Sequence, residues 1–207
     1  MFIHNYSGMN RYEQVFTFMT EKLEAEMPSR LSYHSLNHIL DVLSAAINLA
    51  ELEKLSDTET ELLKVAVLFH DAGFIKTVRG HEEIGCTMAK EILPSFGFSI
   101  PEIEIISGMI MATKYPPSPK TLSEKIICDA DLDYLGRDDF FEIGNKLFNE
   151  LRSQGSLSSE NEWNSLQVNF LTTHRYFTEA SKQLREEKKK IHLREVKKLV
   201  MASNEDL

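Results

Sequence analysis

The sequence has few cysteines and no long hydrophobic run. Its 207 residues hold two cysteines, Cys86 and Cys128, without CxxC spacing, so the disulfide framework of a secreted protein is not indicated. Both lie in apolar segments, and we expect them to be buried, reduced thiols. No apolar stretch approaches the roughly 20 residues that span a bilayer, and residues 1–10 lack the basic and apolar runs of a signal peptide. These absences predict a cytoplasmic protein that does not act in a membrane.

Positive charge is also scarce. The chain carries 23 lysines and arginines against 32 aspartates and glutamates, which gives a net charge of -9. Such a chain has no overall field that attracts a nucleic acid polymer or an anionic membrane, and we expect neither as a partner. A small phosphorylated substrate is compatible with this charge, because a metal ion or a few local cations can bind it. The charge-rich segment 182–201 mixes both signs, as a solvated helix face does, and it could also pack against a second copy of the chain.

Apolar residues recur at steps of three and four along almost the whole chain, whereas strict alternation is rare. Asp57 or Thr58 is the expected N-cap of the third helix, which is apolar on nearly every side and should be buried. The prolines within 115–119 form a loop. The pattern predicts an all-α single domain with helices over residues 11–27, 35–49, 58–71, 81–93, 101–110, 122–134, 138–152, 161–183 and 182–201.

Histidine and acidic side chains interrupt these apolar faces at four places. In chain order they are His34 with His38, His70 with Asp71, His81 with Glu82, and Asp129, Asp131 and Asp133. Each place alone has an ordinary structural explanation, as a core histidine, a solvated acid or a helix cap. Their combination on apolar helices is what indicates a polar site inside the bundle.

An ionisable pair such as His70-Asp71 is costly to bury at the end of the most apolar helix unless something compensates for it. A divalent cation does so, because imidazole and carboxylate are both good ligands. His34 and His38, four residues apart, share one helix face and can point into the same cavity. Two histidines and two aspartates from three helices would make a mixed nitrogen and oxygen site, with positions left for water and a phosphate oxygen. Such a site suits Mn, Fe, Ni, Zn, Co or Mg, with one or two ions per chain.

This order of residues resembles the HD-domain phosphohydrolase superfamily. Residues 38–42 (HILDV) are similar to the helix that carries the first metal ligand, and residues 67–71 (VLFHD) to the run into the signature pair. Residues 81–85 (HEEIG), 110–114 (IMATK) and 129–132 (DADL) resemble further segments of that family, and the likeness covers residues 33–136. Residues 174–178 (HRYFT) are similar to the C-terminal part of one small subgroup.

The resemblance implies an HD-type helical bundle in which His38, His70, Asp71 and Asp131 bind the metal. Asp129 is the alternative to Asp131, and the two lie about 200° apart on a helix, so both cannot face one cavity. The implied division is an N-terminal helix (residues 1–28), a metal-binding core (29–136) and C-terminal helices packed on it (137–207).

Further roles follow from the same resemblance. Tyr33-His34 is similar to a motif of the cyclic-nucleotide phosphodiesterases, with Ser35 in place of an asparagine, and implies that His34 is the general acid. Asp71 or Asp131 would help to deprotonate or position the attacking water. His81 could be a phosphate contact or a ligand of a second metal. Arg79 and Lys114 are candidate substrate-binding residues, with a solvated surface charge as the alternative for each.

The function predicted from the sequence is metal-dependent hydrolysis of a phosphoester, in a nucleotide or a related small phosphate, by a phosphomonoesterase or phosphodiesterase. One alternative is a catalytically silent HD-type module that binds metal and regulates or docks onto a partner. The others are a purely structural helical protein and a di-iron oxygenase, for which His81 would be needed as an additional ligand.

Overall fold

The computed structural model describes residues 8–205, with side chains up to residue 202. Residues 1–7, which include most of the stretch assessed for a signal peptide, and residues 206–207 lie outside the described residues. The all-α prediction is confirmed, and the described chain contains no strand. The helices are α1 (Arg11–Glu26), α2 (Leu36–Leu52), α3 (Asp57–His70), α4 (His81–Ile92), α5 (Ile100–Ala112), α6 (Leu122–Asp131), α7 (Phe140–Ser153), α8 (Glu160–Thr173) and α9 (Glu179–Glu205), with 3-10 turns η1 (Ala72–Ile75), η2 (Leu93–Phe96) and η3 (Asp133–Gly136).

Several helices begin with a capping box, in which a small polar side chain and a glutamate three residues later satisfy each other's backbone N–H groups. The N-cap of α3 is Ser56, paired with Glu59. The prediction of Asp57 or Thr58 was therefore wrong by one or two residues: the extended backbone of the N-cap is found at Ser56, whose side chain accepts the Glu59 N–H, and Asp57 is already helical. Thr121 and Glu124 start α6 in the same way.

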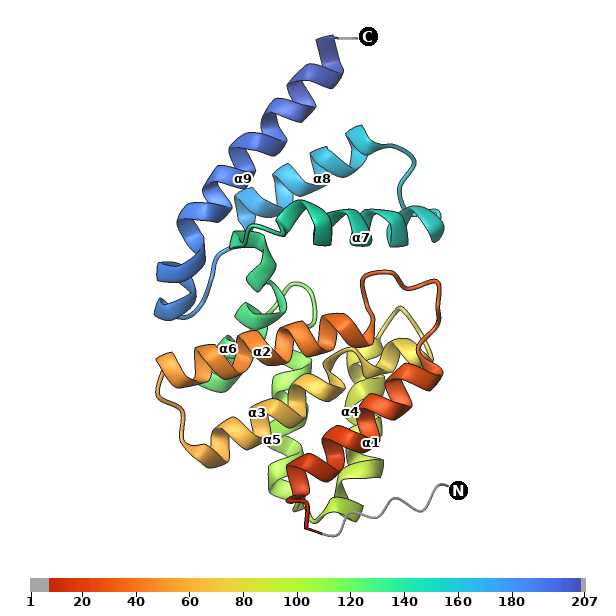
Figure 1. Cartoon of the computed structure of the whole chain (residues 1–207), viewed down its shortest axis with the longest axis vertical. Helices are drawn as coiled ribbons and strands as arrows, with labels where there is room; N and C mark the ends of the chain where they lie inside the picture. The colour runs from red at the N-terminus through yellow and green to blue at the C-terminus, as the bar shows by residue number, and fades with distance from the viewer. Residues whose placement is uncertain (1–7, 206–207) are drawn as a thin grey trace.

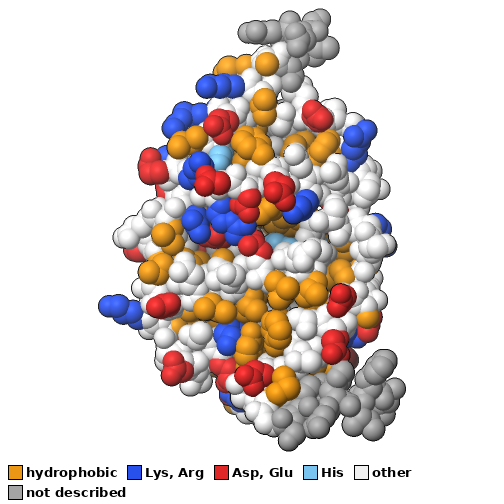
Figure 2. Space-filling view, in the orientation of Figure 1, with side chains coloured by type: hydrophobic (Ala, Val, Ile, Leu, Met, Phe, Trp, Pro, Cys, Tyr) orange, Lys and Arg blue, Asp and Glu red, His pale blue; other side chains and the backbone are white. Residues whose placement is uncertain are grey.

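The first six helices form one half of the molecule and α7–α9 the other (Figure 1). As predicted, α3 is central: it contacts α1, α2, α4, α5 and α6, and every side chain from Val65 to His70 is buried. Lysines and arginines lie interspersed with acidic residues on the face shown in Figure 2. No helix of the described chain is long and apolar enough to cross a membrane.

A buried carboxylate attaches α9 to the first half. Asp129 of α6 accepts hydrogen bonds from the backbone N–H groups of Phe177 and Thr178, both at 2.8 Å, and from the Thr178 hydroxyl at 2.6 Å. The predicted helix over residues 161–183 was therefore wrong. The chain leaves α8 at His174 and restarts at Glu179, because Asp129 binds N–H groups that a continuous helix would use internally.

A second junction is ionic and centres on η3. The buried Asp133 accepts from Arg185 Nε of α9 at 2.7 Å and lies 3.5 Å from Arg137 Nη1. Arg137 in turn reaches Asp41 of α2 at 2.8 Å and Asp139 at 2.7 Å. These contacts fix the C-terminal helices against α2 and α6. The three-part division of the chain stays a prediction.

Both cysteines are free and buried, as the sequence indicated. Cys86 Sγ donates to the Ser107 carbonyl and Cys128 Sγ to the Ala112 carbonyl. Burial raises the pKa of both thiols. They therefore behave as small apolar side chains with a weak donor.

Candidate metal centre and its cavity

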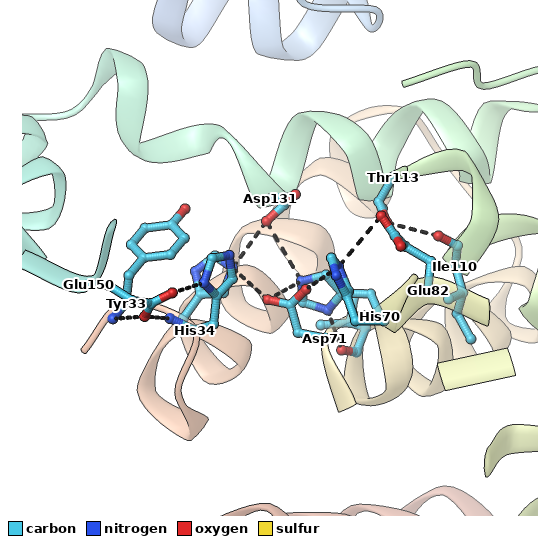
Figure 3. A network of polar contacts seen from close by, with 12 residues as sticks. Tyr33, His34, His70, Asp71, Glu82, Ile110, Thr113, Asp131 and Glu150 are labelled. Atoms are coloured by element: carbon cyan, nitrogen blue, oxygen red, sulfur yellow. Dashed lines mark hydrogen bonds and ion pairs between the residues drawn. The ribbon is translucent and has the colours of Figure 1, made fainter. Parts of the chain in front are cut away.

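Three buried side chains meet where α3 ends beside α2. His70 is the last residue of α3, Asp71 caps it, and His38 lies in the first turn of α2. One ligand atom from each of the three lies within 4.8 Å of the others. Asp71 Oδ2 is 3.4 Å from the Nε2 atoms of both His38 and His70. Figure 3 shows Asp71 beside His70. This is the spacing of atoms that can share one cation.

The fourth predicted ligand comes from α6. Asp131 Oδ1 lies 3.0 Å from His38 Nε2 and 3.6 Å from His70 Nε2, and its side chain is partly open to the cavity described below. Asp129 points the other way, into its bonds with Phe177 and Thr178. The structure therefore brings Asp131 into the cluster and keeps Asp129 out of it, as their separation around the helix requires.

The unpaired atoms of this cluster fit a divalent cation. Of four buried polar side-chain atoms that lack a hydrogen-bond partner in the described chain, two lie here together: His70 Nε2 and Asp71 Oδ2. His70 Nδ1 donates to the Val67 carbonyl at 2.8 Å, which leaves the lone pair of Nε2 directed at the cluster in the neutral ring. Buried polar atoms are rarely left unpaired, and a cation would satisfy both.

The electrostatics of the cluster are those of a cation site. Burial alone would lower the pKa of His70, but the nearby charges of Asp71 and Asp131 outweigh it and raise that pKa to about 9. Burial alone would raise the pKa of Asp131, yet its hydrogen bond to His38 and the nearby ring of His70 hold that pKa well below its usual range. Metal binding at this centre would displace the proton from His70.

His34 lies beside the cluster and is held by a residue of the other half. Its Nδ1 donates to Glu150 Oε1 of α7 at 2.5 Å, and the second oxygen of Glu150 accepts the backbone N–H groups of Tyr33 at 2.9 Å and His34 at 3.1 Å. The His34 ring stacks on Phe74, with centroids 4.1 Å apart. Burial lowers the pKa of His34, but the Glu150 hydrogen bond and nearby carboxylate charges raise it more, so the pKa lies above 6.5.

Sequence analysis missed Glu150, which is 1% exposed. A signal was present, since Leu147, Phe148 and Leu151 place Glu150 on or beside the apolar face of its helix. A buried glutamate needs a partner, but the sequence does not identify His34 as that partner.

His81 begins α4 on the opposite side of Asp71. Its Nε2 lies 3.5 Å from Asp71 Oδ1 and 3.6 Å from Glu82 Oε1, and its ring stacks on Phe74 at 4.0 Å. The close approach depends on Gly73, where a Cβ would lie 1.9 Å from the His81 carbonyl oxygen. Asp71 thus faces His38 and His70 with one oxygen and His81 with the other. Glu82, which the sequence grouped with His81 without a role of its own, is buried beside them.

The two predicted basic residues lie outside this arrangement. Lys114 is ion-paired with Glu83, and both side chains are about half exposed. Arg79 is exposed in the loop before α4. Neither is among the residues that line the cavity, so the structure does not bring them to the cluster.

The cluster opens into a cavity of about 560 Å³ between the two halves of the molecule. Its polar wall includes His34, Asp71, His81, Glu82 and Asp131. Its apolar wall comes mainly from η3, α7 and α8: Leu135, Phe140, Leu147, Leu151, Trp163, Leu166, Phe170 and Leu171. A volume of this size accommodates a small organic ligand.

Comparison with known proteins places this geometry in context. A family model described as HD domain matches residues 35–133. The crystal structure of a predicted HD superfamily hydrolase from an uncultured Thermotogales bacterium has 19% identity and a TM-score of 0.62, and the match covers 98% of this chain and 99% of that one. The crystal structure of Bacillus subtilis YpgQ in complex with ADP has 16% identity and a TM-score of 0.65, covering 91% and 95%. No curated protein matches the chain. At these identities the structural likeness concerns the fold.

Proposed function

The chain belongs to the HD-domain superfamily, and we propose that it is a metal-dependent phosphohydrolase acting on a nucleotide or a related small phosphate. The observation that carries this proposal is the pair of unpaired buried atoms, His70 Nε2 and Asp71 Oδ2, which face Asp131 at the wall of a ligand-sized cavity. YpgQ, which shares the fold, was crystallised with ADP, and this supports a nucleotide as the substrate class.

In this proposal His38, His70, Asp71 and Asp131 hold one divalent cation among Mn, Fe, Ni, Zn, Co and Mg. When bound, the cation supplies Lewis-acid chemistry, since it lowers the pKa of a water and neutralises charge on phosphoryl oxygens. Asp71 positions that water. Its second oxygen, with His81 and Glu82, offers ligands for a second ion or a contact to the phosphate.

His34 acts as the general acid. Because Nδ1 is bonded to Glu150, Nε2 is the atom left to donate a proton to the leaving oxygen. The raised pKa of His34 favours the protonated ring near neutral pH. Glu150 is a positioning residue, which fixes the orientation of the ring and stabilises its charged form. Lys114 could reach a phosphate only by leaving Glu83, and its role and that of Arg79 stay predictions.

The test is loss of metal together with loss of turnover. We expect the purified protein to contain a divalent metal by elemental analysis, and to hydrolyse members of a panel of nucleotides and simple phosphoesters supplied with Mn, Mg, Ni or Co. His70→Ala and Asp71→Ala should each remove both properties. Stoichiometric metal together with full activity in either variant would show that the substituted residue is not a metal ligand. Metal without turnover on any phosphoester would instead identify a silent metal-binding module.

A further inference from the structure

The half of the cavity remote from the metal cluster has a distinct composition. Its wall is formed by α7 and α8, from Leu147 and Leu151 on one helix and Trp163, Leu166 and Phe170 on the other. These side chains are apolar or aromatic and offer flat surface without charge. A ligand part that lies here must therefore be largely apolar.

One buried polar group interrupts this wall. Gln167 of α8 lines the cavity and is only 8% exposed. Its Nε2 makes one long hydrogen bond, 3.4 Å, to Asn164 Oδ1. Within the described residues no donor reaches its Oε1. Gln167 Oε1 is not among the buried polar atoms that lack a partner, so it is accessible from the cavity, and a donor on a bound molecule would pair with it.

At Gly144 the backbone of α7 passes close to Gln167. At Gly144 of α7, an added Cβ would lie 3.5 Å from Gln167 Oε1 and 3.7 Å from Trp163 Cζ2. The amide oxygen and the indole edge thus face the barest point of α7. Alanine at this position would touch both groups without overlapping either.

We propose that this half of the cavity binds the base of a nucleoside phosphate, with an edge N–H of the base donating to Gln167 Oε1. The inference rests on the proposed function, which sets the phosphate at the metal cluster. A nucleobase matches the wall because its ring faces are apolar and can stack on aromatic side chains, whereas its edge carries hydrogen-bonding groups. An acyl chain would leave the amide unpaired, and a free sugar would place its hydroxyl groups against the apolar side chains that form most of this wall.

The chain contains a built-in probe for this site. Trp163 is the single tryptophan in the sequence and lies in the cavity wall beside Gln167. Its fluorescence should change when a base binds against the wall. Titration of metal-stripped protein with nucleoside 5′-monophosphates, ribose 5-phosphate and phenyl phosphate measures the binding preference without any turnover. We expect the nucleotides to bind at least about tenfold more tightly than ribose 5-phosphate, in keeping with one buried hydrogen bond and ring burial.

The decisive variant is Gln167→Met, which keeps the length of the side chain but removes the amide. Nucleotide binding should weaken about tenfold, while binding of ribose 5-phosphate and phenyl phosphate stays within about twofold. Gln183→Met makes the same chemical change at an exposed position of α9 and should leave all affinities unchanged. Thermal unfolding of both variants checks that the fold is retained.

The proposal and the hydrolase assignment fail separately. Equal affinity for nucleotides and ribose 5-phosphate, no change in Trp163 fluorescence with any nucleotide, or an unaffected Gln167→Met would overturn the base site. Phenyl phosphate binding as tightly as nucleotides would identify a merely apolar pocket and overturn the role of the amide. Selective nucleotide binding without hydrolysis in the metal-loaded protein would overturn the hydrolase assignment and leave the base site standing.

Discussion

The two halves of the molecule contribute different kinds of side chain to one cavity, polar and ionisable from one half and mainly apolar from the other. The α1–α6 half supplies charged and metal-ligating atoms: His38, His70, Asp71 and Asp131 meet within a few ångströms where three helices end or begin. The α7–α9 half supplies apolar walls, in which Gln167 is a buried polar group, and Glu150, which lies behind His34. In the proposed function, the α1–α6 half therefore carries the groups that react, and the α7–α9 half carries most of the surface that would contact the rest of the ligand. Glu150, which bonds His34, and Asp129, which bonds the start of α9, couple the two halves.

The largest effect is expected from changing the two aspartates of α6, because Asp131 faces the metal cluster and Asp129 faces the start of α9. Asp131→Asn removes charge from the cluster and should cost several kcal/mol of transition-state stabilisation, or roughly a thousandfold or more in rate. Asp129→Asn should keep the metal but lower the free energy of unfolding by about 1–3 kcal/mol, because its bonds to the start of α9 are impaired. Metal analysis, activity and chemical denaturation separate the two variants, and a reversed outcome would make Asp129 the ligand.

Removal of the proposed acid should affect the reaction without touching the metal. We expect His34→Ala to bind metal normally and to lose roughly 100-fold or more in kcat. The loss should be greatest on substrates with poor leaving groups, since these need the proton most. Rates measured across phosphoesters of graded leaving-group pKa test this. A uniform loss on all of them would contradict the role of His34.

Glu150 crosses from one half to the other, and its neutralisation should have a smaller effect with a characteristic signature. Glu150→Gln removes the charge that raises the pKa of His34, so that pKa should fall. A general acid works only while protonated. Activity is therefore retained below this pKa and lost above it, and the alkaline limb of the pH profile should move to lower pH. At neutral pH we expect a loss of roughly tenfold, from one altered hydrogen bond and charge. A profile that falls in height without shifting would show a structural role only.

The smallest effect is expected when a methyl group is added at one glycine in each half, Gly144 or Gly73. Gly144→Ala places its Cβ at ordinary contact distance from Gln167 and Trp163, and alanine in a helix is favoured by roughly 0.5–1 kcal/mol. The variant should unfold about 1–3 °C higher. Gly73→Ala, the same change beside the metal cluster, would overlap the His81 backbone and should be destabilising. If Gly144→Ala is destabilised, the space between α7 and α8 does not accommodate a methyl group at this position.

The sequence predicted the all-α class and the helix boundaries near the metal centre well, for a physical reason. His38, His70 and Asp131 lie at or near helix ends, where capping residues and changes of apolar period are visible in the chain itself. The helical separation of Asp129 and Asp131 followed from geometry alone, although only packing could show which acid faces the histidines.

Other features depend on contacts between residues far apart in the chain. Glu150 meets His34 across 116 positions, and Asp129 meets Thr178 across 49. No local pattern records such a partner. The break at residues 174–178 was missed for the same reason, because a distant carboxylate competes with the helix for its N–H groups. The burial of Gln167 could not be predicted either, because it depends on the packing of α7 against α8.

The short helix α6 has a mechanical consequence. It is a rigid rod of ten residues, about 15 Å long, that carries Asp131 on one flank and the anchor of α9 on the other. Because both carboxylates are attached to one short helix, they move together. A rotation of α6 about its axis that moves Asp129 relative to Thr178 also moves Asp131 relative to His38. A molecule that binds and displaces α9 would therefore change the distances from Asp131 to His38 and His70.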